Sequence, residues 1–146
     1  MTATERPDLL VTGKMVPVIE ENVDKLFTVH RLANAKDRDA FLAEVSPKIR
    51  AIATGGQFRV TAALMEKMPK LEIVANFGVG YDSVDAKWAG EHGIIVTNSP
   101  DVLNDEVADT TIALLLNTLR ELPQAEQYLR AGKWLEKPYP LTHTLR

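Results

Sequence analysis

The chain has 146 residues, of which 45% are hydrophobic and 25% are charged, and its formal net charge is −3. This length predicts one domain, or one domain and a piece of another, and the negative charge without a Lys/Arg block argues against a nucleic-acid partner. The absence of cysteine excludes disulfides and zinc–thiolate sites, and it is compatible with the cytoplasm, where we expect the protein.

The distribution of apolar residues argues against a signal peptide and against a membrane-spanning segment. Residues 1–8 hold one basic residue and no apolar core, so no signal peptide is predicted. The longest apolar run, residues 112–116, is far shorter than the roughly 20 residues that span a bilayer, so no membrane partner is predicted.

In the first 99 residues, short apolar runs alternate with segments of helical periodicity. The second predicted helix begins at Asp37 and the third at Thr61, while the fourth is capped by Asp82 or Ser83 and ends before Gly93. Repeats of this length predict an α/β fold with a parallel, doubly wound sheet and helices on both faces. We expect a five-stranded, flavodoxin-like domain over residues 1–99. Its predicted strands are residues 9–11, 27–32, 49–53, 71–75 and 94–96.

The segment after residue 99 has a different character. Ser99-Pro100 can begin a helix, Asn104 can cap a second start, and the main helix is predicted from Val107 to Leu119. Its five consecutive apolar residues point in all directions around a helix, which predicts that the helix is buried on every side. The sheet domain can cover one side only, so the rest is expected to face another domain or another chain. Beyond Pro123 a short helix should end at Gly132, and residues 133–146 should form an extended arm.

The turn Gly78-Val79-Gly80 follows a predicted strand and precedes a predicted helix. A dinucleotide-binding loop needs a third glycine three residues further on, where this chain has Ser83, so no pyrophosphate site is predicted here. A two-glycine turn can still present backbone N–H groups to a small carboxylate. A tight turn without a ligand explains the same residues equally well.

Gly55 and Gly56 end the third predicted strand, and they are expected beside the Gly78–Gly80 turn at the carboxyl edge of the sheet. This proximity favours a ligand at both loops, although a flexible turn accounts for the two glycines as well. The residues that follow, Gln57 to Arg59, are candidates for substrate preference.

An acidic cluster spans residues 101–109. Asp105 and Asp109 share a helix face and suggest a divalent cation, but the helix macrodipole explains acidic residues there and no second ligand group is visible. No metal site is therefore predicted. The histidines are assigned no catalytic role, because none has a carboxylate at triad or ligand spacing in the sequence: His30, His92 and His143.

Several segments together resemble the D-isomer-specific 2-hydroxyacid dehydrogenases, in particular the branch of glyoxylate, hydroxypyruvate and hydroxyphenylpyruvate reductases. The first 60 residues share the layout of that family but little of its signature. The matching segments are residues 71–74, 78–82, 98–103, 107–109 and 130–134.

The resemblance implies a division of labour along the chain. Residues 1–99 would form the substrate-binding, or "catalytic", domain, and residues 100–146 would supply the first helices and arm of a nucleotide-binding Rossmann domain. The helix from Val107 to Leu119 would form a homodimer, and Val107 would approach the nicotinamide. The backbone amides of Val79 and Gly80 would hold the substrate carboxylate. The other substrate-site residues would be Gly78, Gly55 and Gly56.

The family reduces 2-keto acids to D-2-hydroxy acids with NADH or NADPH. Its glycine-rich phosphate loop and its catalytic arginine, glutamate and histidine are expected beyond residue 146, so no catalytic residue is assigned in this chain. The resemblance thus predicts an N-terminal fragment that is inactive alone and does not bind NAD or NADP tightly.

Two other interpretations stay open. One is a non-enzymatic dimerisation or partner-binding module of the same fold family, since related corepressors bind peptides. The other is a flavodoxin-like or receiver-like single domain. A receiver needs clustered acidic residues after its first strand, where this chain has Val11-Thr12-Gly13, so this interpretation is the weaker one.

Overall fold

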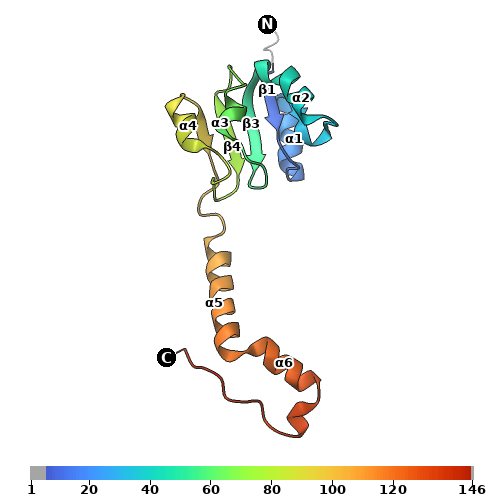
Figure 1. Cartoon of the computed structure of the whole chain (residues 1–146), viewed down its shortest axis with the longest axis vertical. Helices are drawn as coiled ribbons and strands as arrows, with labels where there is room; N and C mark the ends of the chain where they lie inside the picture. The colour runs from blue at the N-terminus through green and yellow to red at the C-terminus, as the bar shows by residue number, and fades with distance from the viewer. Residues whose placement is uncertain (1–5, 146) are drawn as a thin grey trace. The chain divides into compact units, whose positions relative to one another are not determined.

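The computed structural model describes residues 6–145, and the chain divides after Val102 into two compact units. The first unit is built on a five-stranded parallel sheet in the order β2-β1-β3-β4-β5 (Figure 1). This order is that of the flavodoxin-like folds, so the predicted fold class is confirmed. The strands are β1 (Asp8–Val11), β2 (Thr28–Arg31), β3 (Ile49–Gly55), β4 (Ile73–Phe77) and β5 (Ile95–Thr97).

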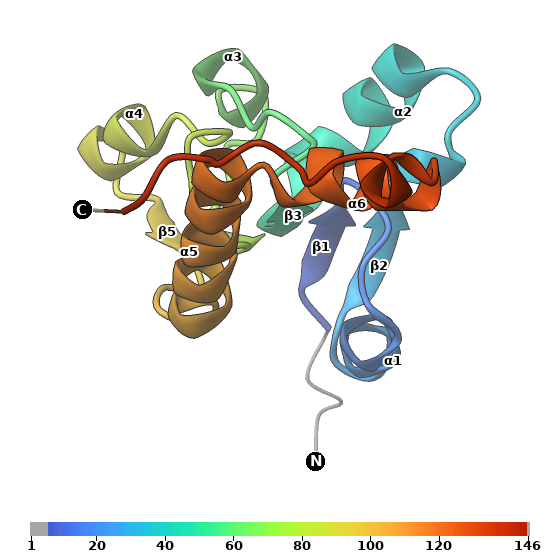
Figure 2. The ribbon, with the colours of Figure 1, turned by 90° about the horizontal axis from the view of Figure 1, so that it is seen from below.

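The helices of the first unit lie on both faces of the sheet, but unequally. Helix α1 (Pro17–Leu26) lies on one face, whereas α2 (Arg38–Val45), α3 (Ala62–Met65) and α4 (Ala86–Glu91) lie on the other (Figure 2). The chain first runs from β1 outward to β2 and then returns across the sheet as far as β5. Because each crossover is right-handed, the connecting helices lie on the opposite face once this direction reverses. Short 3₁₀ turns, η1 (Leu32–Asn34) and η2 (Ser46–Lys48), link α2 to its neighbouring strands.

Two apolar layers follow from the alternation of side chains along the strands. Leu10, Ile52 and Val74 are fully buried on the side of α2, α3 and α4, where they belong to the larger cluster. Leu9 and Val11 point to the opposite face, where they pack with residues of α1 and with the alanines of β3.

Helix α1 leaves part of its own face of the sheet uncovered. On this face, Phe77 is 51% exposed and Ile95 is 60% exposed, although both follow the strand alternation that normally buries apolar residues. A hollow of about 390 Å³ extends over the uncovered strands, from Leu9 and Ala51 to Ile73 and the ends of β4 and β5.

Two predicted helix caps are confirmed. The carboxylate of Asp37 accepts hydrogen bonds from the N–H groups of Asp39 and Ala40, both at 3.1 Å, at the start of α2. The hydroxyl of Thr61 accepts from the N–H of Leu64 at 3.3 Å at the start of α3. In both cases the acceptor and the donors are neighbours in the sequence, so the local pattern is sufficient.

The predicted start of α4 at Asp82 or Ser83 is wrong, because the helix begins at Ala86 after Asp85. The residues before it form a turn that pairs with the segment leading into α3 through a parallel bridge between Val60 and Val84. The strand predicted at residues 71–75 also starts later, at Ile73, where pairing with β3 begins. The predicted end of α4 is confirmed by Gly93, whose φ of +72° lies in the left-handed region that suits glycine.

The second unit contains α5 (Asn104–Arg120), α6 (Leu122–Arg130) and a 3₁₀ turn, η3 (Lys133–Leu135). Asn104 is the first helical residue of α5 and Leu103 precedes it as the cap, so the predicted capping role of Asn104 is wrong. The predicted arm opens with η3 instead of running extended from residue 133, and Gly132 ends α6 with a φ of +73°.

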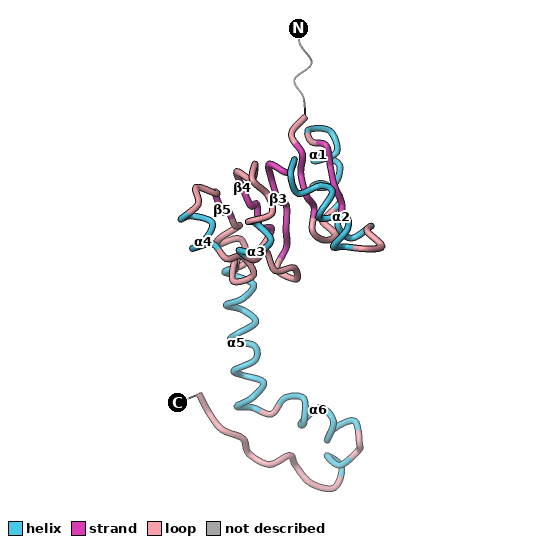
Figure 3. Tube along the Cα trace, turned by 45° about the horizontal axis from the view of Figure 1, so that its top comes forward, coloured by secondary structure: helices cyan, strands magenta, loops and turns pink. Residues whose placement is uncertain are grey.

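The arm is tied back to the corner between α5 and α6 (Figure 3). Tyr139 donates from its hydroxyl to the carboxylate of Glu121 at 2.7 Å, and Arg120 donates to the hydroxyl of Thr142 at 3.1 Å. Glu121 itself has a φ of +50°, which lets the chain turn sharply between the two helices. The acceptor carboxylate raises the pKa of Tyr139, because it stabilises the protonated hydroxyl.

In this chain taken alone no described residue of α5 is buried, whereas its apolar run predicts a helix enclosed by another domain or another chain. Val107 is 60% exposed, Ile112 56% and Leu114 62%. The cover of this helix by another domain or another chain therefore stays a prediction. Among residues 6–145, no helix combines the length and the apolar character that crossing a bilayer requires.

Candidate functional site

The two glycine turns of the sequence follow neighbouring strands of the sheet. Gly55 is the last residue of β3 and pairs in register with Phe77, the last residue of β4, directly before the turn Gly78–Gly80. A side-chain carbon built at Gly55 would lie 3.8 Å from the carbonyl oxygen of Phe77. The parallel register therefore brings both turns to one edge of the sheet.

Each of the three carbonyls in the Gly78–Gly80 turn accepts a hydrogen bond from the protein. In chain order they accept from the backbone N–H of Ser99 at 2.9 Å, from the side-chain amide of Asn98 at 2.7 Å and from the side-chain amide of Asn76 at 2.8 Å. Two of these donors come from the segment after β5, and the third comes from β4 itself. The turn is therefore fixed by its carbonyl side.

The N–H groups of the same turn are differently placed. That of Gly78 donates to the carbonyl of Asn76 at 3.1 Å, whereas those of Val79 and Gly80 have no acceptor among the described residues. Val79 and Gly80 are also exposed at the surface. Two consecutive backbone donors without a protein acceptor form a site that a small anion can occupy.

Backbone strain does not explain the glycines at this edge, since none of the four has a φ in the left-handed region. An added Cβ would meet nothing within 4 Å at Gly56 and only ordinary contacts at Gly55 and Gly78. At Gly80 it would lie 3.1 Å from Oδ2 of Asp82, the end of an exposed side chain. The missing side chains therefore leave the backbone open to solvent.

A row of buried polar side chains lies beneath the turns, at the ends of three adjacent strands. Thr12, Thr54 and Asn76 are 5%, 0% and 4% exposed, and the hydroxyl of Thr12 donates to that of Thr54 at 2.8 Å. The side-chain oxygen of Asn76 is buried without a hydrogen-bond partner among the described residues. Its amide nitrogen is thus the atom that ties this row to the turn above.

Sequence reasoning assigned no role to Asn76 or Asn98. For Asn76 a local signal existed, because a polar residue interrupts the apolar run of β4 directly before the glycine turn. For Asn98 no local signal exists, since its acceptor lies 19 residues earlier, in the turn that follows the neighbouring strand β4.

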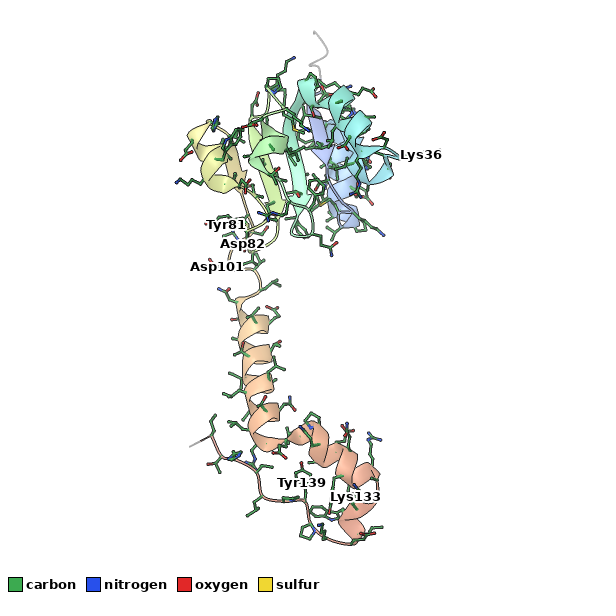
Figure 4. All side chains as sticks on the ribbon, viewed as in Figure 1. Lys36, Tyr81, Asp82, Asp101, Lys133 and Tyr139 are labelled. Atoms are coloured by element: carbon green, nitrogen blue, oxygen red, sulfur yellow. The ribbon has the colours of Figure 1, made fainter. Side chains whose placement is uncertain are left out.

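Other polar groups border this edge. Figure 4 shows Tyr81, Asp82 and Asp101 at the same end of the first unit. A smaller hollow of about 250 Å³ lies between the ends of β1 and β3, and Lys14, Gln57 and Phe58 contribute to its wall. Arg59 does not line this hollow.

The two histidines of the first unit, His30 and His92, lie away from the glycine turns. His30 is in contact with Asp8, with Nε2 and Oδ1 2.6 Å apart, so the fold gives it a carboxylate neighbour that spacing along the sequence did not indicate. The parallel register of β1 and β2 brings together residues that are 22 positions apart. Asp8 begins β1, whereas the glycine turns follow carboxyl ends, so this pair joins two strands at the amino end of the sheet. His92 stacks on Trp88 with ring centroids 3.8 Å apart.

The predicted acidic cluster, residues 101–109, and the predicted cofactor contact, Val107, belong to the segment around the start of α5. Residues 101–109 include the start of α5, and no group of three or more potential metal ligands occurs among residues 6–145. Val107 lies in α5 and is largely exposed, and its approach to a nicotinamide stays a prediction.

Comparison with known proteins identifies relatives of the whole described chain. Residues 9–143 match the family described as D-isomer specific 2-hydroxyacid dehydrogenase, catalytic domain. A hydroxyphenylpyruvate reductase of Plectranthus scutellarioides is 38% identical over 134 residues, which are 92% of this chain and 43% of that protein. A 2-ketogluconate reductase of Gluconobacter oxydans is 33% identical over 142 residues, which are 97% of this chain and 44% of that protein.

Solved structures share the fold. A 2-hydroxyacid dehydrogenase from Ketogulonicigenium vulgare Y25 has a TM-score of 0.82 and 44% identity over 97% of this chain and 45% of that one. An NADPH-dependent glyoxylate/hydroxypyruvate reductase from Sinorhizobium meliloti, in complex with NADP and malonate, has a TM-score of 0.75 and 46% identity, and covers 97% of this chain and 44% of its own. The chain spans less than half the length of these relatives. Because the catalytic-domain match extends over nearly all described residues, the protein belongs to the family of D-isomer specific 2-hydroxyacid dehydrogenases.

Proposed function

We propose that this chain is the substrate-binding part of a reductase that converts a small 2-keto acid to a D-2-hydroxy acid with NADH or NADPH. The observation that carries the proposal is the Gly78–Gly80 turn, whose carbonyls are all bound by the protein while two of its N–H groups have no described acceptor. Two adjacent N–H donors match the two oxygens of a carboxylate, and hydrogen bonds to a charged acceptor are the stronger kind.

The relatives support this choice of ligand. Glyoxylate, hydroxypyruvate, hydroxyphenylpyruvate and 2-ketogluconate, after which the relatives are named, all carry a carboxylate beside the carbonyl that is reduced. The turn would hold that shared carboxylate through Val79 and Gly80. The surrounding surface would be kept free of side chains by Gly78, Gly55 and Gly56. With its carboxylate on the turn, the substrate would extend its carbonyl beyond the edge of the sheet.

The glycine turn before α4 does not offer a comparable site for the nucleotide cofactor. A dinucleotide pyrophosphate requires a helix that starts directly at the glycine turn. Here α4 begins only at Ala86, and the intervening residues pair with the segment before α3. The residues present thus do not fit the pyrophosphate, and the proposed role of residues 1–146 is to bind and orient the acid.

The proposal is tested by titrating the ¹⁵N-labelled chain with malonate, the acid present in the Sinorhizobium meliloti complex. We expect the amide signals of Val79 and Gly80 to shift in a saturable way, because a carboxylate bound there accepts their hydrogens. Malonamide, which has the same size and no charge, is the matched control and should leave both signals in place. Equal shifts with both compounds, or none with malonate, would contradict the carboxylate site.

The proposal also includes the prediction that the purified 146-residue chain does not oxidise NADH or NADPH with glyoxylate or hydroxypyruvate. Neither a proton donor nor a site for the cofactor pyrophosphate is assigned within it, and substrate positioning alone does not replace them. Measurable turnover by the chain would show that this part of the proposal is wrong.

A second candidate function rests on α5, whose large apolar side chains are exposed. We propose that a second copy of the chain covers this helix, either within the reductase or in a non-enzymatic dimerisation or partner-binding module. Sedimentation of the chain should then show one dimeric species, and Leu115→Glu should convert it to a monomer. Gln127→Glu adds the same charge on α6 and serves as the control. A dimer without any response to malonate would favour the non-enzymatic module, whereas aggregation would contradict dimerisation through α5.

A further inference from the structure

The carbonyls of the glycine turn determine where its N–H groups lie. A trans peptide unit is planar, so the carbonyl of one residue and the N–H of the next point in opposite directions within one rigid plane. The carbonyl of Val79 shares its plane with the N–H of Gly80. Because the amide of Asn98 binds this carbonyl at 2.7 Å, Asn98 sets the orientation of the donor at the other end of the plane.

The neighbouring planes are held in the same way by other groups. The carbonyl of Gly78, whose plane carries the N–H of Val79, is held by the backbone N–H of Ser99 at 2.9 Å. The carbonyl of Gly80, whose plane carries the N–H of Tyr81, is held by the side chain of Asn76 at 2.8 Å. Of these three anchors, Asn98 is the one that acts through a side chain on a donor of the carboxylate site.

We propose that Asn98 is a positioning residue for substrate binding: by holding the Val79 carbonyl, its side-chain amide aims the Gly80 N–H at the substrate carboxylate. This inference rests on the proposed function, since it presupposes that Val79 and Gly80 bind a carboxylate. Asn98 does not contact the substrate. It acts across two strands, because it follows β5 and its acceptor follows β4.

The side-chain amide of Asn98 suits the role of donor to the Val79 carbonyl. An amide is a neutral donor of the size needed to span from β5 to the turn. An aspartate has the same shape, but its carboxylate cannot donate to a carbonyl, and it places a negative charge beside a site for an anion. Asn98 is half-buried and its hydrogen bond is accessible to water, so its loss should cost little folding free energy.

The experiment compares three forms of the ¹⁵N-labelled chain, the wild type, Asn98→Ala and Asn98→Asp, by malonate titration and by thermal unfolding. A single hydrogen bond predicts a rise in the Kd for malonate of roughly three- to tenfold in Asn98→Ala. Asn98→Asp should bind more weakly still. Before malonate is added, the amide signal of Gly80 should already differ from that of the wild type in both variants. The midpoint of thermal unfolding should change by only about 2 °C.

The order of the two variants separates positioning from a merely structural role. If Asn98 only filled space, the isosteric aspartate would be tolerated better than alanine, which is the reverse of the expected order. Asn22→Ala is the matched control, because Asn22 also donates from its side chain to a carbonyl, that of Val18 at 2.8 Å, on α1. Its malonate affinity should equal that of the wild type.

The outcomes distinguish this inference from the proposed function. Absence of malonate shifts at Val79 and Gly80 in the wild type would overturn the proposed function and the inference with it. Wild-type shifts together with an unchanged Kd in both Asn98 variants would overturn the inference alone. If malonate affinity falls only together with a large fall in the unfolding midpoint, Asn98 has a role in folding, and the inference is overturned as well.

Discussion

A side chain at Gly80 would obstruct a ligand at the turn more than it would disturb the fold of the protein. Its φ lies outside the left-handed region, and an added Cβ approaches only the far end of the exposed Asp82 side chain, at 3.1 Å. We therefore expect Gly80→Val to fold with a free energy of unfolding within about 1 kcal/mol of the wild type. Its branched side chain should shield the Gly80 N–H, raising the Kd for malonate about tenfold or more and the KM of a complete reductase for its keto acid.

The matched control for this substitution is Gly90→Val. Gly90 is exposed on α4, and an added Cβ there meets nothing within 4 Å. Malonate affinity should be unchanged in this variant. A wild-type Kd and KM in Gly80→Val would mean that the carboxylate is held elsewhere.

Among the elements, α3 is capped in part by a residue distant in the sequence. This four-residue helix receives the carboxylate of Asp85, whose Oδ2 accepts from the N–H of Ala62 at 2.8 Å. Asp85→Ala should lower the free energy of unfolding by about 1 kcal/mol, as other lost caps do, and Asp85→Asn should lower it less. Urea unfolding measures the difference, with the exposed Asp82→Ala as the control. Equal stability of Asp85→Ala and Asp82→Ala would argue against this cap.

Helix α1 and strand β2 are joined by an ion pair that predicts a pH dependence. The guanidinium of Arg31 donates to Glu20 at 2.8 and 3.1 Å, and this hydrogen bonding lowers the pKa of Glu20 below its usual value. A carboxylate with a lowered pKa contributes stability above its ordinary pKa of about 4.3, and the contribution is lost as the pH falls through the lowered value. In Arg31→Met the pKa of Glu20 should return towards normal, and stability should fall less steeply below pH of about 4.3. NMR titration of the Glu20 carboxyl carbon tests this, and an unchanged pKa in Arg31→Met would refute it.

At the scale of the whole molecule, the buried core lies entirely in the first unit. All buried apolar side chains among the described residues precede Val102, whereas none occurs in α5, α6 or η3. We expect residues 1–102 alone to unfold cooperatively with a midpoint within a few degrees of that of the full chain. Residues 103–146 alone should be only marginally helical, since short isolated helices gain little without packing. Circular dichroism of the two fragments tests both statements: a disordered 1–102 fragment would contradict the first, and a stably helical 103–146 fragment would contradict the second.

Local patterns were sufficient for much of the fold. Strand alternation places Leu10 and Leu9 on opposite faces, and the caps at Asp37 and Thr61 involve residues within three positions of each other. Right-handed crossovers, which are a general property of parallel sheets, place helices on both faces once the flavodoxin-like strand order is given. The expected boundaries of residues 1–99 and 100–146 stay predictions about domain roles, although the compact units divide close by, after Val102.

The contacts that sequence reasoning missed have a common physical origin. The Asn98–Val79, Asp8–His30 and Asp85–Ala62 contacts join residues 19, 22 and 23 positions apart, which is about one βα repeat. Neighbouring strands of a parallel sheet bring such residues side by side, but a shift of register by a single position would separate them. Strand alternation and the caps at Asp37 and Thr61 were therefore determined by the sequence alone. The partners of Asn98, His30 and Asp85 were decided only by the tertiary structure, because strand register is a property of the assembled sheet.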